Sequence, residues 1–552
     1  MNSEPLRSML REDPRALLKR VRALKMRPLM SIVMPVYNTE AGVLRKSIDS
    51  VLGQIYKRWE LCICDDGSTM TDIPDILKGY AKRESRIKVQ TSGRNHGIAK
   101  AINKGVGMAS GEYLGVLDHD DELDPMTLWE YAGKINEKPD ADCIYCDEDK
   151  IDENGNYCEP WFKSDWNPDM SLSFNYVMHF AVYRRRLFER LGGVRSAYEG
   201  SQDYDILLRV AERTDKIYHI PRVLYHWRKS TDSIASGPEA KPEIFERGLA
   251  ALQDALNRRG IEGTAEHAPD AWKGVFRVRR KLNLPLTCSV VIASSGDNAG
   301  LLRLLDSIKS TGIISSIHEI LVCIHSSSGM ETDEFSGPYG DCVRFIRFGG
   351  KDTVPRAFNS GIEHALGDVI WLMDESMEIL SSQSYYELSA QAQREDVGAV
   401  GGKIFYPNGF IEHAGVILGP FGILGYAHRM TPDTPGYVGL KNMICNYSAV
   451  LGLGMMTRRM VFINSCGFNE EFEKAYWDVD YCLRLRQDGY LVTYTPYAKF
   501  RHYISVPSLD EMIIEPEAEL FRKKWKHVIE RDPYYNPNLT RDLEDFSFSP
   551  IS

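Results

Sequence analysis

The sequence predicts an α/β protein that contains two tandem copies of one mainly parallel sheet. Short apolar segments of strand length alternate with helical patterns from Ser31 onward, and most of these segments end in polar residues. The same order of elements starts again at Ser289. The chain has 552 residues, 43% of them hydrophobic, so it is long enough to bury two large cores.

The first half reads as an alternating series of strands and helices. The predicted strands cover 31–38, 60–68, 87–90 and 113–118, and the predicted helices cover 43–52 and 98–109. This alternation is typical of a Rossmann-like parallel sheet, in which ligands bind at the carboxyl ends of the strands. No Gly-x-Gly-x-x-Gly motif follows the first strand, so a dinucleotide site is not predicted.

We expect five segments along the chain. They are a basic helical extension (1–30), domain 1 (31–265), a connector (266–285), domain 2 (286–510) and a C-terminal tail that packs on domain 2 (511–552). The extension carries eight Lys or Arg and three acidic residues, with leucines near helical spacing. Such a helix can lie on an anionic membrane or pack on domain 1 with its charges in water, and both alternatives stay open.

Composition excludes several classes of protein. The net charge of −10 argues against a general nucleic-acid binder. No apolar run approaches the length of a membrane span. Eleven cysteines, most of them within apolar runs, predict a reduced cytoplasmic protein, and we expect Cys143 and Cys146 to be buried strand residues rather than metal ligands.

The strand at 113–118 ends in the acidic motif Asp118-His119-Asp120-Asp121. Two carboxylates at the carboxyl end of a strand suit a Mg²⁺ or Mn²⁺ that also holds substrate phosphates. A solvated acidic turn is the alternative reading of this motif alone.

Farther along, Asp203 falls in the first turn of a predicted helix that Ser201 can cap. The helix dipole favours an ionised carboxylate at this position. A later strand brings His226 and Arg228 together.

The spacing of these landmarks recurs in the second half. Ser31 to Asp118 spans 87 residues and Ser289 to Asp374 spans 85; Asp118 to Asp203 spans 85 and Asp374 to Asp478 spans 104; Asp203 to His226 spans 23 and Asp478 to His502 spans 24. Similar spacing over four landmarks predicts two copies of one fold.

The second copy lacks several of the polar residues of the first. Ser376 stands in place of Asp120, Ile324-His325 in place of Asp65-Asp66, and Ala293 to Gly296 in place of Pro35 to Asn38. These losses predict a weakened or altered donor site, or a site for a different ligand. Asp478 and His502 remain and could still bind a cation.

Together these motifs resemble glycosyltransferase family 2, the inverting enzymes of the GT-A fold. The resemblance covers about residues 31–505. It rests on Pro35 and Asn38, Asp65-Asp66-Gly67-Ser68, Gly111-Glu112 leading to Asp118-His119-Asp120-Asp121, Gln202-Asp203 and His226-Trp227-Arg228. The tandem arrangement is similar to bacterial transferases that build O-antigen, rhamnan or capsule-type polysaccharide, and Asn446-Tyr-Ser-Ala449 and Asp532 to Leu539 add to that likeness.

The resemblance implies a role for each motif. Asp203 would be the general base, and Asp118, Asp120 and His226 would hold Mn²⁺ or Mg²⁺. The nucleotide and its diphosphate would contact Pro35, Tyr37, Asn38, Asp65, Asp66, Lys100, Asp118 and Arg228. The counterparts in the second copy are Asp374, Ser376, Asp478 and His502.

The implied reaction transfers a sugar from dTDP-rhamnose or a UDP-sugar to a glycan or lipid-linked glycan, with inversion at the anomeric carbon. One alternative is an enzyme with two live sites that makes two linkages, and another is a non-catalytic carbohydrate-binding or assembly protein. The resemblance places the protein in the cytoplasm, and it allows a homodimer and peripheral contact with the inner face of the cytoplasmic membrane.

Overall fold

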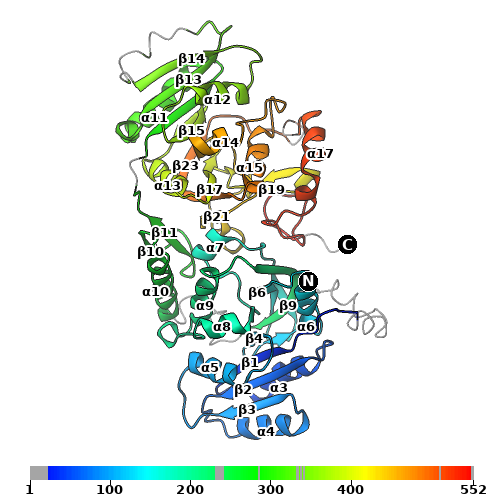
Figure 1. Ribbon diagram of the computed structural model, residues 1–552. Helices are drawn as coiled ribbons and strands as arrows, with labels where there is room; N and C mark the ends of the chain where they lie inside the picture. The colour runs from blue at the N-terminus through cyan, green and yellow to red at the C-terminus, as the bar shows by residue number, and fades with distance from the viewer. Residues whose placement is uncertain are drawn as a thin grey trace.

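The structure is a computed structural model. It describes residues 23–229, 242–283, 286–330, 335, 339, 342–508, 511 and 513–548. Most of the predicted N-terminal helix lies outside the described residues, because the description begins at residue 23. The two copies form two lobes stacked end to end, with the C-terminal segment beside their boundary (Figure 1). Within the described part of the chain, no helix has the length and apolarity needed to cross a membrane.

The first lobe is built on one sheet. Its strands are β1 (Met30–Val36), β2 (Trp59–Asp65), β3 (Ile87–Thr91), β4 (Tyr113–Val116), β5 (Glu122–Leu123), β6 (Cys143–Ile151), β7 (Tyr157–Trp161), β8 (Val182–Arg184) and β9 (Ile217–Arg228). They lie in the order β3-β2-β1-β4-β8-β6-β9-β5, with β7 beside β6. The strands predicted from sequence, β1 to β4, are mutually parallel, whereas β8 and β5 run antiparallel to their neighbours. The predicted α/β class is confirmed.

Helices flank this sheet and position its loops. They include α3 (Ala41–Leu52), α4 (Ile73–Arg83), α5 (Ile98–Met108), α6 (Thr127–Glu137), α7 (Pro168–Ser173), α9 (Gln202–Ala211) and α10 (Pro242–Arg258). Leu44, Ile48 and Val51 show why α3 forms where it does, since their helical spacing creates one apolar face and all three are fully buried.

The second lobe repeats the first sheet strand for strand. Its strands are β12 (Cys288–Ser294), β13 (Glu319–His325), β14 (Val343–Phe348), β15 (Val369–Asp374), β16 (Met377–Ile379), β17 (Val397–Phe405), β22 (Met456–Arg458) and β23 (Leu491–His502). The order β14-β13-β12-β15-β22-β17-β23-β16 corresponds position by position to that of the first sheet. The strand directions agree as well, so the predicted repeat is confirmed.

A buried glutamate ties the central strands together in each lobe. Glu60 accepts hydrogen bonds from the Ser31 hydroxyl (2.6 Å) and pairs with Lys88 (2.8 Å). Glu319 accepts the matching bond from the Ser289 hydroxyl (2.7 Å). Burial alone would raise the pKa of Glu60, but Lys88 and the surrounding N–H and O–H donors lower it to about 2. Both lobes therefore keep the same internal carboxylate, which sequence spacing did not single out.

The lobes meet through a buried polar contact between α7 and the short strand β21 (Cys445–Asn446). Asn167 and Asn446 each donate to the other's backbone or side-chain oxygen at 2.9 Å. Asp169 accepts from Asn446 Nδ2 (2.7 Å) and Arg394 Nη1 (2.8 Å), and all of these groups are buried or nearly so. One hydrophobic cluster includes residues of both lobes. The Asn446 motif thus fixes the contact between the copies.

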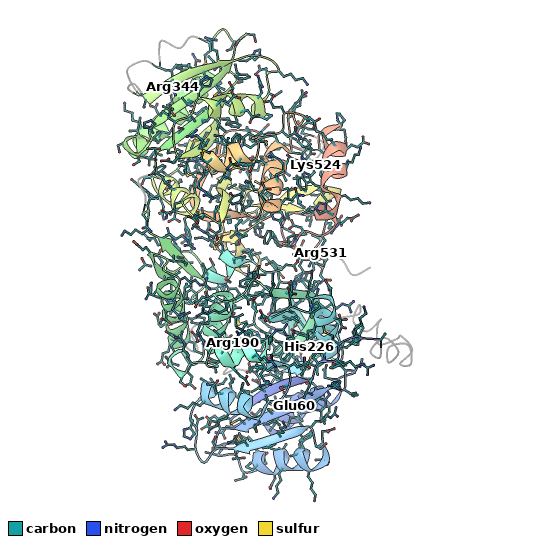
Figure 2. All side chains as sticks on the ribbon, viewed as in Figure 1. Glu60, Arg190, His226, Arg344, Lys524 and Arg531 are labelled. Carbon is teal, nitrogen blue, oxygen red and sulfur yellow. The ribbon has the colours of Figure 1, made fainter. Side chains whose placement is uncertain are left out.

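The connector and the tail also join the lobes. The connector contains β11 (Phe276–Arg280), which pairs with β10 (Gly263–His267). Helix α17 (Glu517–Glu530) packs on the second lobe, where Trp525 Nε1 donates to Asp480 (2.9 Å). Beyond it, Arg531 pairs with Asp165 of the first lobe (2.8 Å), and Figure 2 shows Arg531 at the boundary between the lobes. The tail therefore contacts both copies.

Candidate active site

A cleft of about 1460 Å³ opens at the carboxyl ends of the first sheet. Asp118 and Asp120, which follow β4, and Asp203, in the first turn of α9, all line it. The fold thus brings together three carboxylates that lie up to 85 residues apart in sequence. Ser201 does not cap α9 as predicted; its hydroxyl donates instead to the carbonyl of Ile244 (2.7 Å).

The acidic loop is held from beneath by Asp121 and Arg228. Asp121 is 1% exposed and accepts hydrogen bonds from the Tyr225 hydroxyl and from the backbone N–H of Arg228 (2.7 Å). The Arg228 side chain donates to the carbonyl of Asp120 (3.0 Å) and pairs with Glu122. The structure therefore places Arg228 as a support for the loop, with its guanidinium already engaged by protein groups.

Asp203 has the surroundings of a base. It accepts a hydrogen bond from Asn175 Nδ2 (2.9 Å). Burial raises the pKa of Asp203 above its ordinary value, and the positive charge of His179 and the hydrogen bond from Asn175 limit that rise. A carboxylate with a raised pKa is a stronger proton acceptor than an exposed aspartate.

His226 contacts residues other than Asp118 and Asp120. Its Nδ1 is 2.6 Å from Asp149 Oδ1, and its ring stacks on Tyr157 at 4.2 Å. Side chains alternate along a strand, so the next residue, Trp227, points to the opposite face of β9 and lines the cleft. The prediction that His226 joins Asp118 and Asp120 around a metal is therefore not supported by its position.

His179 is a cleft residue that sequence reasoning missed. Its Nδ1 lies 3.4 Å from Glu148 Oε2. Burial alone would lower the pKa of His179, but the charges of Glu148, Asp118 and Asp121 raise it to about 9. No spacing in the sequence linked this histidine to the acidic motif, because it comes from the loop before the unpredicted strand β8.

The end of β2 offers two free acceptors. Asp66 Oδ2 accepts the N–H groups of His96 (2.7 Å) and Gly97 (2.8 Å) at the start of α5, and Asp65 Oδ1 accepts the N–H of Ser68 (3.0 Å). Within the described part of the chain, Asp65 Oδ2 and Asp66 Oδ1 are buried without a hydrogen-bond partner. Buried oxygens of this kind suit an N–H donor from a ligand.

Of the other residues predicted to contact the nucleotide-sugar, Tyr37 lines the cleft. Pro35 is buried in β1, and Tyr37 is 41% exposed. Asn38 accepts the backbone N–H of Thr69 (2.8 Å), so it shapes the loop after β2. Lys100 is exposed on α5.

Asp118 and Asp120 fit a divalent ion that binds together with a phosphate ligand. In the described ranges, no group of three or more His, Cys, Asp or Glu side chains forms a metal site by itself. Mg²⁺ is commonly held by one or two protein carboxylates, with substrate phosphates and waters as its other ligands. The two aspartates supply that partial set.

In the second lobe the corresponding carboxylates hydrogen-bond to groups of the protein. Ser376 donates from its N–H (3.0 Å) and its hydroxyl (2.6 Å) to Asp374. Asp478 accepts the N–H groups of Gly452 (2.7 Å) and Val479 (2.8 Å). These carboxylates are therefore used within the protein.

The strand register also corrects one pairing between the copies. Glu122 lies opposite His226 in the first lobe, whereas Glu378 lies opposite Arg501 in the second. His502 thus corresponds to Trp227, and its Nδ1 is 2.9 Å from Glu412. A shift of one residue moves a side chain to the other face of a strand, so similar spacing in sequence did not mean an equivalent position.

Comparison with known proteins agrees with the repeat. The model of glycosyl transferase family 2 matches residues 31–192 and 289–438, one segment in each copy. The uncharacterized protein y4gI of Sinorhizobium fredii is 35% identical over 547 residues, which are 96% of this chain and 59% of that protein. The O-antigen biosynthesis protein RfbC of Myxococcus xanthus is 32% identical over 532 residues, 95% of this chain and 41% of that protein.

The chain therefore spans about half the length of these two relatives. Among solved structures, S. aureus TarS 1–349 is 19% identical, with a TM-score of 0.32 over 42% of this chain and 71% of that one. The family model covers more than half of the chain and falls on both lobes. The chain belongs to glycosyl transferase family 2.

Proposed function

We propose that the first lobe is a metal-dependent, inverting glycosyltransferase. It would move a sugar from dTDP-rhamnose or a UDP-sugar to a glycan or lipid-linked glycan in bacterial surface polysaccharide synthesis. The observation that carries the proposal is one cleft that presents Asp118, Asp120 and Asp203 together. Family membership and the name of the Myxococcus xanthus relative, an O-antigen biosynthesis protein, support it.

The donor binds at the carboxyl ends of β1, β2 and β4. The free oxygens of Asp65 and Asp66 suit the N3–H of a uracil or thymine ring, and Tyr37 borders the same cleft. Asp118 and Asp120 would hold the Mg²⁺ or Mn²⁺ ion. Charge neutralisation of the departing nucleoside diphosphate is the chemistry that this ion supplies when bound.

Asp203 takes the proton of the acceptor hydroxyl. As that oxygen bonds to the anomeric carbon, the bond between this carbon and the diphosphate oxygen breaks, and the electron pair leaves with the diphosphate. A single displacement inverts the anomeric centre, because the acceptor oxygen attacks opposite the departing diphosphate. A retaining path through a covalent intermediate would need a second, nucleophilic carboxylate.

The second lobe serves as a support rather than a second donor site. In the second lobe, Ser376 occupies the position of Asp120. Ile324 occupies the position of Asp65 in the strand register. The internal hydrogen bonds of Asp374 and Asp478 favour this role over that of an enzyme with two live sites.

The test measures nucleoside diphosphate released from a panel of dTDP- and UDP-sugars with Mn²⁺ or Mg²⁺ and a sugar acceptor. Wild type should turn over one donor, while Asp120→Ala and Asp203→Asn should each lose at least a hundredfold in rate. Asp478→Asn should lose stability but keep the rate of the folded protein. Loss of one donor's turnover in folded Asp478→Asn would show that the second lobe is catalytic, and no turnover by folded wild type would overturn the proposal.

A further inference from the structure

One wall of the cleft is aromatic. Trp161 contacts Phe174 with ring centroids 5.4 Å apart, Phe174 meets Trp272 edge-on at 5.0 Å, and Trp272 meets Phe245 edge-on at 6.4 Å. All four rings line the cleft, and they come from β7, the end of α7, the β10–β11 turn and α10. We call these four residues the aromatic wall.

The aromatic wall begins beside the proposed base. Phe174 is followed by Asn175, whose side chain donates to Asp203 at 2.9 Å. A ligand whose reacting group lies at Asp203 can therefore extend along the wall without leaving the cleft.

Polar side chains accompany the rings. Glu199, Gln202 and Arg247 also line the cleft. Sugar rings present both C–H faces, which pack on aromatic rings, and hydroxyls, which hydrogen-bond to polar groups. Arg247 donates to the carbonyl of Glu199 (2.7 Å), and Gln202 accepts the N–H of Gly200 (2.6 Å). A hydrocarbon chain could not hydrogen-bond to the remaining donors and acceptors of these side chains, so the lining favours a glycan over a lipid tail.

The second lobe and the tail complete this part of the cleft. Val438 and Phe548 line it together with the aromatic wall. Asn442 of the second lobe donates to the carbonyl of Asp270 (2.6 Å), two residues before Trp272. A Cβ on Gly274 would lie 1.8 Å from the Trp272 ring, so only glycine lets the ring sit in this position.

We propose that the aromatic wall is the acceptor subsite, which binds the sugar residues preceding the hydroxyl that attacks the donor. The proposal rests on the glycosyltransferase function proposed above. It also gives the second lobe a task, because this lobe holds the Trp272 turn in place from behind.

The first arm of the test measures binding without turnover. Tryptophan fluorescence of wild type, Trp272→Ala, Trp272→Phe and Trp161→Ala is titrated with maltohexaose, chitohexaose and rhamnose oligosaccharides, and separately with decanol. We expect one oligosaccharide to bind wild type, and both alanine variants to bind it at least tenfold more weakly, with Trp272→Phe in between. Tyr386→Ala, an exposed aromatic on the second lobe, is the matched control and should bind as wild type does.

The second arm measures the KM for the acceptor and the Kd for UDP and dTDP. Trp272→Ala should raise the acceptor KM at least tenfold and leave the nucleotide Kd unchanged, and Asn442→Ala should raise the acceptor KM less. Wild type that turns over donor, with an acceptor KM untouched by Trp272→Ala and Trp161→Ala, would overturn the acceptor subsite alone. Binding of decanol without any oligosaccharide would overturn it in favour of a lipid occupant, whereas absence of all donor turnover would refute the proposed function instead.

Discussion

Asn536, in the C-terminal segment, donates from Nδ2 to both carboxylate oxygens of Asp147 in the first lobe, at 3.0 and 3.1 Å. The same nitrogen donates to the carbonyl of Lys163 (2.8 Å), and Lys163 Nζ pairs with Glu148 (2.8 Å). Glu148 in turn accepts the N–H of His179 (2.7 Å), a residue of the cleft. The tail is therefore linked to the cleft through the buried residues Asn536, Lys163 and Glu148.

Replacing Asn536 should weaken both stability and activity. Asn536→Ala removes the hydrogen bonds from Nδ2 to Asp147 and to the Lys163 carbonyl, although Asp147 keeps its contacts with His219 and the Lys163 N–H. The expected cost is about 1–3 kcal/mol in the free energy of unfolding. We expect a lower kcat with little change in the donor KM, because the cleft loses support rather than a ligand contact. Asn283→Ala, on the exposed connector, is the control for urea unfolding and steady-state kinetics. Equal behaviour of the two variants would contradict the link.

His226 should act as a structural residue. Its partner is Asp149, so His226→Gln and Asp149→Asn should each lower the unfolding free energy by about 1–3 kcal/mol, and the double variant should lose less than the two losses added together. Titration with Mn²⁺ in the presence of UDP or dTDP should give an unchanged Kd for His226→Gln and a much weaker one for Asp120→Asn. A weakened Mn²⁺ Kd in folded His226→Gln would restore the histidine as a ligand.

Glu60 and Glu319 should contribute similarly to the stability of their lobes. Glu60→Gln and Glu319→Gln each remove an internal carboxylate, at an expected cost of about 1–3 kcal/mol. The pKa of folded Glu60 is about 2 against an ordinary 4.5, so its contribution is present above pH 4.5 and disappears as the pH falls toward 2.

Urea unfolding between pH 7 and pH 3 measures how the contribution of Glu60 to the free energy of unfolding changes with pH. The difference between wild type and Glu60→Gln should stay constant down to about pH 4.5 and shrink below it. A difference that grows on acidification would contradict it. Glu378→Gln, a more exposed glutamate, is the control.

The pH dependence of turnover should reflect the ionisation of Asp203. The base must be ionised to accept a proton, and its pKa is raised by burial, so the acidic limb of kcat should lie above the pH range of an ordinary aspartate. Asn175→Ala removes a hydrogen bond that lowers this pKa, and should move the limb to still higher pH. A limb that moves to lower pH in Asn175→Ala would argue against Asp203 as the base.

Much of the architecture could be predicted because it depends on local patterns. The parallel strands β1, β2 and β4 are mostly apolar runs, and helix α3 shows one buried face, so their patterns are visible in the sequence. The acidic motif was found for the same reason, since a carboxylate pair directly after a buried strand is conspicuous.

What was missed depends on contacts between distant segments. Strand β8 has three residues and β5 has two, too few for a period. His226 and Trp227 are neighbours in sequence but point to opposite faces of β9, and only pairing with β5 shows which of them reaches the cleft. His179 and the aromatic wall gather from segments that no spacing rule connects.

The reciprocal bonds between Asn167 and Asn446 limit how such proteins can exchange parts. The Asn167 side chain bonds to the backbone of Asn446, and the Asn446 side chain bonds to Asp169, so a first lobe without Asn167 or Asp169 would leave a polar group of Asn446 buried without that partner. Exchange of one lobe alone should therefore destabilise the protein unless the residues of α7 and β21 that meet at the boundary still match. The two halves of this chain, although they share one fold, are expected to be inherited as a single unit.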